Sequence, residues 1–175
     1  MQLNCTFSSM KLQLIKANNS HIEIINTLAT EIWNKHYIEI ISQAQINFML
    51  EKMYSAQSLE QQIAESGTFF YLVEAEEKNI GFIGVSTTDN KNWQLNKFYL
   101  LNTTQGKGFG TTAFNLLLQE LNSPQQIQLR VNRQNYKSVN FYFKNNFVIE
   151  KLDDLDLGEG YFMNDFVMRW QNKKP

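Results

Sequence analysis

The stretch Gln105-Gly106-Lys107-Gly108-Phe109-Gly110 is informative because of what lies on either side of it. Before it, residues 93–101 (WQLNKFYLL) have the pattern of a strand, and after it residues 111–121 (TTAFNLLLQEL) have the pattern of an amphipathic helix. Glycine lets the backbone approach a ligand closely and adopt positive φ. The free N–H groups of a first helical turn attract anions, helped by the helix dipole. The stretch therefore predicts a site for a phosphorylated ligand.

Two common phosphate-binding turns do not fit these residues. A P-loop requires a glycine five positions before the Gly-Lys pair and a serine or threonine after it, but Leu101 and Gly108 occupy those positions. The dinucleotide-binding pattern G-x-G-x-x-G is matched only in its looser form, in which Ala113 stands at the position of the last glycine. That turn also needs an acidic residue at the end of the next strand, where residues 129–132 (LRVN) have none. We therefore disfavour both.

The pattern Q/R-x-x-G-x-G/A fits better, and in this loop the chain resembles the GNAT superfamily of acyl-CoA-dependent N-acetyltransferases. A second block, residues 135–147 (NYKSVNFYFKNNF), is similar to the family pattern N-x-x-A/S-x-x-F/L-Y-x-x-x-G-F. Asn146 replaces the usual glycine, and asparagine is the next-best residue for a left-handed helix end. The two blocks cover about the last half of the domain. A looser similarity, in residues 32–55, is to bacterial spermidine/spermine N-acetyltransferases.

The composition suits a single globular domain. Of 175 residues, 43% are apolar and 13% aromatic, which is enough for a sizeable core. With 16 basic and 17 acidic residues the net charge is −1, which argues against nucleic acid and membrane surfaces as partners. The one cysteine, Cys5, cannot form an internal disulfide, so we expect a cytoplasmic protein, and we expect no metal site. One domain is expected over residues 1–175, with residues 1–9 as a possible loose extension.

Hydrophobic periodicity predicts an α+β fold with a mixed central sheet flanked by helices. The predicted order is β-ααα-β-β-β-α-β-α-β-β, as in the GNAT-like acyl-CoA N-acyltransferase fold. Helices are expected at residues 20–37, from a cap at Ser42, and at 58–65, 111–121 and 136 onward. Strands are expected at residues 11–16, 68–75, 80–87, 93–101, 127–132, 148–155 and 161–170, with a polar hairpin turn at 76–79.

The resemblance implies acetyl-CoA as the cofactor. The main chain of residues 98–101 is expected to pair with the pantetheine arm like an added strand, with the Leu100 amide facing the thioester oxygen. Asn135 is expected near the pantetheine or as a helix N-cap, and Lys144 near the phosphates or in solvent. The full expected cofactor set is Phe98, Tyr99, Leu100, Leu101, Gln105, Gly106, Lys107, Gly108, Phe109, Gly110, Thr111, Asn135 and Lys144.

The resemblance also assigns a catalytic residue, Tyr142. Transfer of an acetyl group from a thioester to an amine requires protonation of the thiolate as it leaves. Family members place a tyrosine at this position, within reach of the coenzyme sulfur. An ordinary phenol titrates near pH 10 and is therefore a proton donor at neutral pH. The alternative for Tyr142 is packing between helix and sheet.

The general base is not assigned by the sequence. Many relatives carry a glutamate on the central strand, but Gln94 and Asn96 stand there, and an amide cannot take up a proton. A water chain or Glu31 remains as a candidate, although Glu31 also fits a solvated surface charge. His36 is expected to have a structural role.

The acceptor cleft is expected between the first two helices and the last strands. The candidate substrate residues are Glu31, Trp33, Tyr37 and Tyr54. Five acidic residues near the C-terminus would attract a polycation or form a solvated turn, namely Asp153, Asp154, Asp156, Glu159 and Asp165.

The sequence therefore predicts an N-acetyltransferase that moves an acetyl group from acetyl-CoA to a primary amine of a small molecule, with a polyamine as one candidate. A protein N-acetyltransferase and a non-catalytic acyl-CoA sensor are the alternatives, and the missing strand carboxylate favours the sensor. No nucleic acid or membrane partner is expected. A homodimer through an exposed strand edge is a further possibility.

Overall fold

The structure, a computed structural model, describes residues 11–104 and 106–172. Seven strands form one mixed sheet in the order β1-β2-β3-β4-β5-β7-β6. The strands are β1 (Leu12–Lys16), β2 (Thr68–Ala75), β3 (Lys78–Thr87), β4 (Asn92–Leu100), β5 (Gln126–Asn132), β6 (Val148–Gly158) and β7 (Tyr161–Gln171). The helices are α1 (Ile22–His36), α2 (Gln43–Tyr54), α3 (Ala56–Ala64), α4 (Phe109–Glu120) and α5 (Tyr136–Lys144), with short 3₁₀ turns η1 (Asn19–His21) and η2 (Asn102–Thr104). The extension expected over residues 1–9, with Cys5, lies outside the described residues.

The predicted α+β order of elements is confirmed, and the differences are at element ends. The hairpin between β2 and β3 turns on Glu76 and Glu77 alone, both with positive φ, so β3 starts at Lys78 instead of Ile80. Helix α4 starts at Phe109, two residues earlier than predicted, because Gly108 takes the N-cap position with φ 76°. Helix α3 also starts two residues early, because the Ser55 side chain accepts a hydrogen bond from the Ser58 amide.

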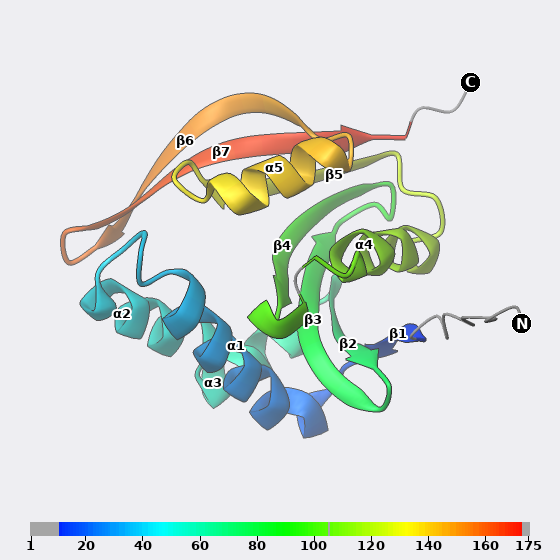
Figure 1. Ribbon diagram of the computed structural model, residues 1–175, viewed down its shortest axis with the longest axis horizontal. Coiled ribbons are helices and arrows are strands. Elements are labelled where there is room, and N and C mark those ends of the chain that lie inside the picture. The colour runs from blue at the N-terminus through cyan, green and yellow to red at the C-terminus, as the bar shows by residue number, and fades with distance from the viewer. Residues whose placement is uncertain (1–10, 105, 173–175) are drawn as a thin grey trace, which may run out of the picture.

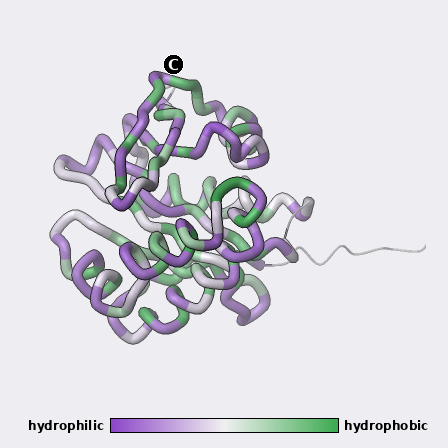
Figure 2. The backbone as a smooth tube through the Cα atoms, turned by 90° about the vertical axis from the view of Figure 1, so that its left-hand side faces the viewer, coloured by the Kyte–Doolittle hydropathy of each residue, from purple (hydrophilic) through white to green (hydrophobic). Residues whose placement is uncertain are grey.

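The helices cover the two faces of the sheet separately (Figure 1). Helices α1–α3 pack on one face around a core that contains Ile25, Ile46 and Phe82. Helices α4 and α5 pack on the other face around Leu95, Phe114 and others. Figure 2 shows hydrophobic and hydrophilic positions alternating along the chain, as expected for elements that bury one side. The sheet is therefore the middle layer of three.

Strands β4 and β5 separate along their length. They pair in parallel from Asn92–Gln126 only as far as Leu95–Leu129. At that point the β3–β4 register shifts, with Gly84 opposite Lys97 and Val85 opposite Leu95, so Asn96 is an extra residue on β4. A bulge of this kind bends a strand and re-aims its side chains. Beyond it, β4 continues along β3 while its other edge has no strand partner, and a wedge opens in the sheet.

The β6–β7 hairpin extends away from the sheet to α2 (Figure 1). The Gln45 side chain donates a hydrogen bond to the Phe162 carbonyl at 2.9 Å. The Lys52 ammonium donates to the Leu157 carbonyl at 3.2 Å. The turn of the hairpin therefore meets the helical layer and encloses the space below the wedge.

Candidate active site

A cavity of about 1030 Å³ fills the wedge. Its walls come from the separated parts of β4 and β5, the glycine loop with the start of α4, helix α5, the end of α1, helix α2 and the β6–β7 hairpin. The cavity runs from a helix N-terminus to a chamber lined by aromatic rings. A long space of this size, lined by apolar, aromatic and polar side chains, is typical of a ligand site.

The end of the cavity at the glycine loop is shaped for an anion. Gly106 and Gly108 both have φ 76°, a conformation that other residues adopt at a cost. Both line the cavity, as do Phe109, Gly110 and Thr111. The first amides of a twelve-residue helix begin there, so partial positive charge faces the space. Lys107 does not line the cavity, and Gln105 lies outside the described residues.

Gly110 has a separate role in packing. A Cβ atom added at this position would lie 2.8 Å from Cε2 of Phe141 on α5. The Phe141 ring stacks on Phe98 of β4, with ring centroids 5.6 Å apart. Gly110 therefore allows α4 to approach α5, and this contact sets the spacing of the cavity walls.

The middle of the cavity follows the free edge of β4. Phe98, Tyr99, Leu100 and Leu101 all line it. Alternate backbone N–H and C=O groups of a strand point toward opposite neighbours. Because β5 has left β4 beyond Leu95, half of these groups face the cavity, where an extended ligand can pair with them.

Tyr142 projects from α5 into the same space and is 8% exposed. Its ring packs edge-on against Phe141 and Phe147, with centroids 5.2 and 5.3 Å away. Burial, with the nearby Tyr37 phenol, raises the pKa of Tyr142, so its hydroxyl stays protonated at neutral pH. Tyr142 is therefore both packed against its neighbours and in contact with the cavity.

Asn135 joins the two sides of the cavity. As the N-cap of α5 it accepts a hydrogen bond from the Ser138 amide at 3.2 Å, and it is 3% exposed. Its side chain also interacts with His36 and Tyr37 at the end of α1. The sequence left open whether Asn135 is a cap or a cavity residue, and its position satisfies both. Lys144 lines the cavity at an exposed position.

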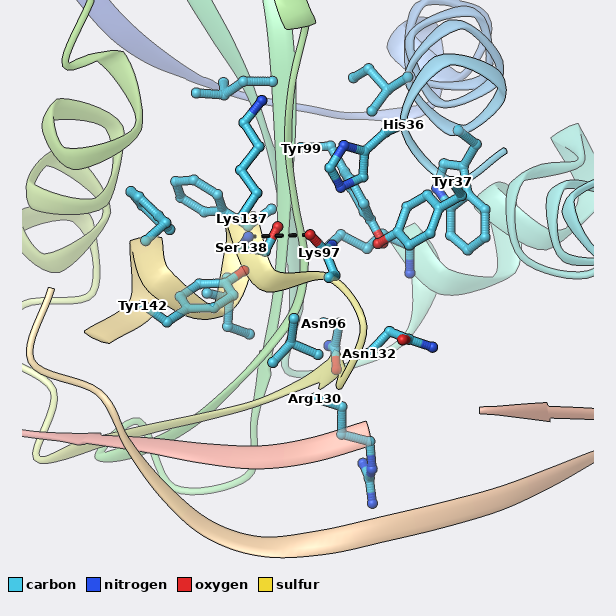
Figure 3. A pocket seen from close by; sticks show the side chains of 18 of the residues that line it. His36, Tyr37, Asn96, Lys97, Tyr99, Arg130, Asn132, Lys137, Ser138 and Tyr142 are labelled. Carbon is cyan, nitrogen blue, oxygen red and sulfur yellow. Dashed lines mark hydrogen bonds between the residues drawn. The ribbon is translucent and has the colours of Figure 1, made fainter. Parts of the chain in front are cut away.

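Aromatic rings from α1 and β4 form the acceptor end, which we call the aromatic chamber (Trp33, Tyr37 and Tyr99). Trp33 and Tyr37 stack with ring centroids 4.4 Å apart, and Trp33 lies 6.1 Å from Tyr99. Burial raises the pKa of Tyr37, and hydrogen bonding with Tyr99 opposes that shift. Figure 3 shows His36 and Tyr37 on one side of the pocket, with Tyr142 and Lys137 on the other.

Two predicted substrate residues are not at the cavity. Glu31 is exposed and pairs with Lys35 at 2.8 Å one helical turn away, so it is corrected to a surface residue. Tyr54 is fully buried against Trp33, with ring centroids 5.8 Å apart, and does not line the cavity. Trp33 and Tyr37 do line it.

Sequence reasoning missed or misjudged three ionisable groups that line the cavity. Burial lowers the pKa of Lys97 to about 8, and its ammonium donates to Gln62 Oε1 at 2.5 Å. Burial also lowers the pKa of His36, so its ring is neutral at neutral pH. Asp165, one of the five acids for which the sequence left a polycation site or a solvated turn open, is 1% exposed. Its position between Met163 and Val167 on one face of β7 was the available signal for burial.

Other sites are not found in the described part of the chain. No three His, Cys, Asp or Glu residues among 11–104 and 106–172 gather closely enough for a metal ion. No helix in these ranges is long and apolar enough to span a membrane.

Comparison with known proteins identifies the fold and the family. The model of the acetyltransferase (GNAT) domain family matches residues 38–153, well over half of the chain. The chain belongs to the GNAT acetyltransferase family. A curated spermidine N(1)-acetyltransferase from Thermoplasma acidophilum is 29% identical over 154 residues, which cover 84% of this chain and 94% of the relative.

Solved structures agree with that assignment. The PaiA N-acetyltransferase of Thermoplasma acidophilum, in complex with coenzyme A, has a TM-score of 0.79 and 26% identity, over 93% of this chain and all of that one. A spermidine N-acetyltransferase from Vibrio cholerae, in complex with CoA and spermine, has a TM-score of 0.66 and 21% identity, over 91% and 95% of the two chains. The GNAT acyl-CoA N-acyltransferase fold predicted for this acetyltransferase is thereby confirmed.

Proposed function

We propose that this GNAT acetyltransferase moves an acetyl group from acetyl-CoA to a primary amine of a small molecule, with a polyamine as the leading candidate. One observation carries the proposal. A single cavity connects the N-terminus of α4, the free edge of β4 and the aromatic chamber. This order of parts suits a ligand with an anionic end, an extended arm and a reactive group near Tyr142.

The donor half uses the residues assigned by sequence. The amides of Gly108 to Thr111 bind the pyrophosphate at the start of α4. The free edge of β4, residues 98–101, pairs with the pantetheine arm, and the Leu100 amide faces the thioester oxygen. Support comes from the lining of the cavity and from the coenzyme A complex of the PaiA relative.

The chemical step is a direct attack on the thioester. The neutral amine attacks the carbonyl carbon, and the developing oxyanion accepts a hydrogen bond from the Leu100 amide. The C–S bond then breaks, the nitrogen loses its second proton, and the departing sulfur gains a proton from the Tyr142 hydroxyl. Tyr142 regains its proton from the amine nitrogen that attacked, directly or through water.

The acceptor half favours a small amine over a protein. The aromatic chamber is closed on the far side by the β6–β7 hairpin, which contacts α2. Flat aromatic faces attract ammonium and alkyl-ammonium groups. The polyamine assignment is further supported by the similarity to the curated spermidine acetyltransferase.

The test is free-thiol release from acetyl-CoA with a panel of spermidine, spermine, an aminoglycoside, an amino acid and a lysine-containing peptide. We expect turnover with a polyamine and the lowest rate with the peptide. Tight coenzyme A binding by calorimetry without turnover on any amine would favour the sensor. Absence of coenzyme A binding would contradict the donor assignment.

A further inference from the structure

Asp165 is a buried carboxylate that forms no direct ion pair with the described residues. It is 1% exposed, and its Oδ1 atom has no hydrogen-bond partner among the described residues. Leaving a buried charged oxygen unpaired destabilises a fold. Asp165 also lines the cavity. A carboxylate retained in this position suits a ligand that supplies the missing donor.

The position of Asp165 places it at the acceptor end. On β7 it lies between Asn132 of β5 and Asp153 of β6. Its charge acts on the phenol of Tyr37, which belongs to the aromatic chamber. Met163, two residues before it on the same face of β7, also lines the cavity. The carboxylate therefore faces the chamber from the sheet, opposite α1.

The neighbouring carboxylates are paired with arginines and Asp165 is not. Asp153 accepts a hydrogen bond from Arg130 at 2.5 Å, and Asp154 pairs with Arg133. In Figure 3 the Arg130 side chain points away from the other labelled residues, toward β6. The other carboxylate that lines the cavity in the described chain is Glu65, which is exposed.

We propose that Asp165 receives the ammonium group of the acceptor and removes the proton that the amine must lose before it attacks the thioester. This inference rests on the proposed function. The N–H bond of R–NH₃⁺ breaks, the proton moves to the Asp165 carboxylate, and the electron pair that remains on nitrogen forms the new C–N bond. The proton leaves Asp165 to solvent after product release. Asp165 thereby supplies the base absent from Gln94 and Asn96.

The charges around Asp165 suit this role. Burial raises the pKa of Asp165 to about 6, the Arg130 and Arg133 guanidinium groups oppose that rise, and Asp153 and Asp154 support it. From the residue that follows α1, the facing group is the neutral phenol of Tyr37. The carboxylate is thus ionised at neutral pH and is a stronger base than an ordinary aspartate.

The test is Asp165→Asn in the full chain, with spermidine as acceptor. We expect kcat/KM for spermidine to fall about 100-fold or more while the KM for acetyl-CoA changes less than about twofold. The wild-type rate should level off above an apparent pKa near 6, and this inflection should be absent from the variant. Its rate should instead rise about tenfold per pH unit, as the free amine becomes more abundant. A purely structural role would not move this profile.

Two controls keep the test decisive. Glu60→Gln makes the same change of charge at an exposed position of α3, outside the cavity lining, and should leave kcat/KM within about twofold. The melting temperature of Asp165→Asn should equal or exceed that of the wild type, because the substitution removes an unpaired buried charge. An Asp165→Asn enzyme whose profile keeps the inflection near pH 6 would overturn the inference.

Calorimetry with spermidine and coenzyme A separates this inference from the proposed function. Spermidine binding that weakens at least tenfold in Asp165→Asn, without wild-type turnover, would support the ammonium site and contradict the transferase proposal. Wild-type turnover that is equal in Asp165→Asn would overturn the Asp165 inference alone. No turnover and no spermidine binding in the wild type would overturn both.

Discussion

Tyr142 differs from phenylalanine by a single hydroxyl group, so the substitution Tyr142→Phe tests the role of that hydroxyl alone. The ring packs between Phe141 and Phe147, so Tyr142→Phe should fold with the same contacts. We expect kcat to fall about 100-fold, within the usual range for loss of a general acid, and the KM for acetyl-CoA to change little. Steady-state kinetics against the wild type measures both. Equal kcat values would show that Tyr142 only packs.

Lys97 provides a second prediction at this scale. Burial lowers the pKa of Lys97 from 10.5 to about 8. A basic group whose pKa is lower in the folded state destabilises the fold most at a pH at which it is charged. Between those values the unfolded chain holds the proton and the folded chain does not, so stability rises with pH. Lys97→Met should therefore stabilise the fold by about 1–3 kcal/mol at pH 7.

The gain from Lys97→Met should shrink as the pH rises from 8 toward 10, and urea unfolding at pH 7 and pH 9.5 measures it. The loss of the hydrogen bond to Gln62 reduces the gain at both values alike. Effects of other lysines cancel in the comparison with the wild type. A difference that stays the same at both values would show that Lys97 has an ordinary pKa.

Single residues were predictable where the reason is local. Asn146 has φ 65°, as expected of an asparagine that replaces a helix-ending glycine, and the Phe147 amide donates to the Tyr142 carbonyl at 3.0 Å. The burial of Asp165 and Lys97 is different in kind. It is produced by helices and strands that are far away in the sequence, so the local sequence left a solvated turn open for Asp165 and gave no expectation for Lys97.

At the scale of elements, the close contact between α4 and α5 depends on the absence of a side chain at Gly110. Gly110→Ala would place a methyl group 2.8 Å from the Phe141 ring and push the two helices apart. We expect a loss of about 1–3 kcal/mol in the free energy of unfolding and weaker binding of coenzyme A, because the same helices form walls of the cavity. Asn115→Ala, at an exposed position of α4, is the control.

Chemical unfolding and calorimetry report the two effects of Gly110→Ala separately. Helix propensity alone would make alanine the better residue by up to about 1 kcal/mol. A stability that rises in both variants would therefore contradict the close contact.

Elements were predictable from periodicity, and their ends were less so. Hydrophobic spacing located the elements that bury one face, whereas β6 has no buried residue. The early start of α4 depends on the backbone conformation of Gly108, and the short β2–β3 turn on two glutamates with positive φ. Such conformations are chosen by the pairing of the flanking strands and the packing of the helix, which the local sequence does not encode.

For the whole molecule, the site depends on how distant parts meet. The sequence placed the glycine loop, β4 and α5 in one site through family resemblance. The separation of β4 from β5 after Leu95 and the contact of the β6–β7 hairpin with α2 arise only in the assembled sheet. The aromatic chamber therefore exists only after the first helices and the last strands have come together.

The hairpin contact gives a prediction that tests this assembly. The Phe48 ring of α2 packs on Tyr161 at 5.1 Å, beneath the Lys52 ammonium at 5.2 Å. Phe48→Ala should loosen the hairpin and raise the KM for the acceptor up to about tenfold. This factor corresponds to the loss of one aromatic pair, which contributes up to about 1.5 kcal/mol. The KM for acetyl-CoA should stay within about twofold, because the glycine loop and α4 are outside this contact.

Phe143→Ala removes an exposed aromatic ring from α5, outside the cavity lining, and is the matched control. Steady-state kinetics with each substrate varied in turn distinguishes the two constants. If Phe48→Ala raised both KM values together, the hairpin would support the whole sheet and not the acceptor chamber alone. A rise confined to the acceptor would show that the last strands and the second helix close one end of the cavity while the other end binds the cofactor independently.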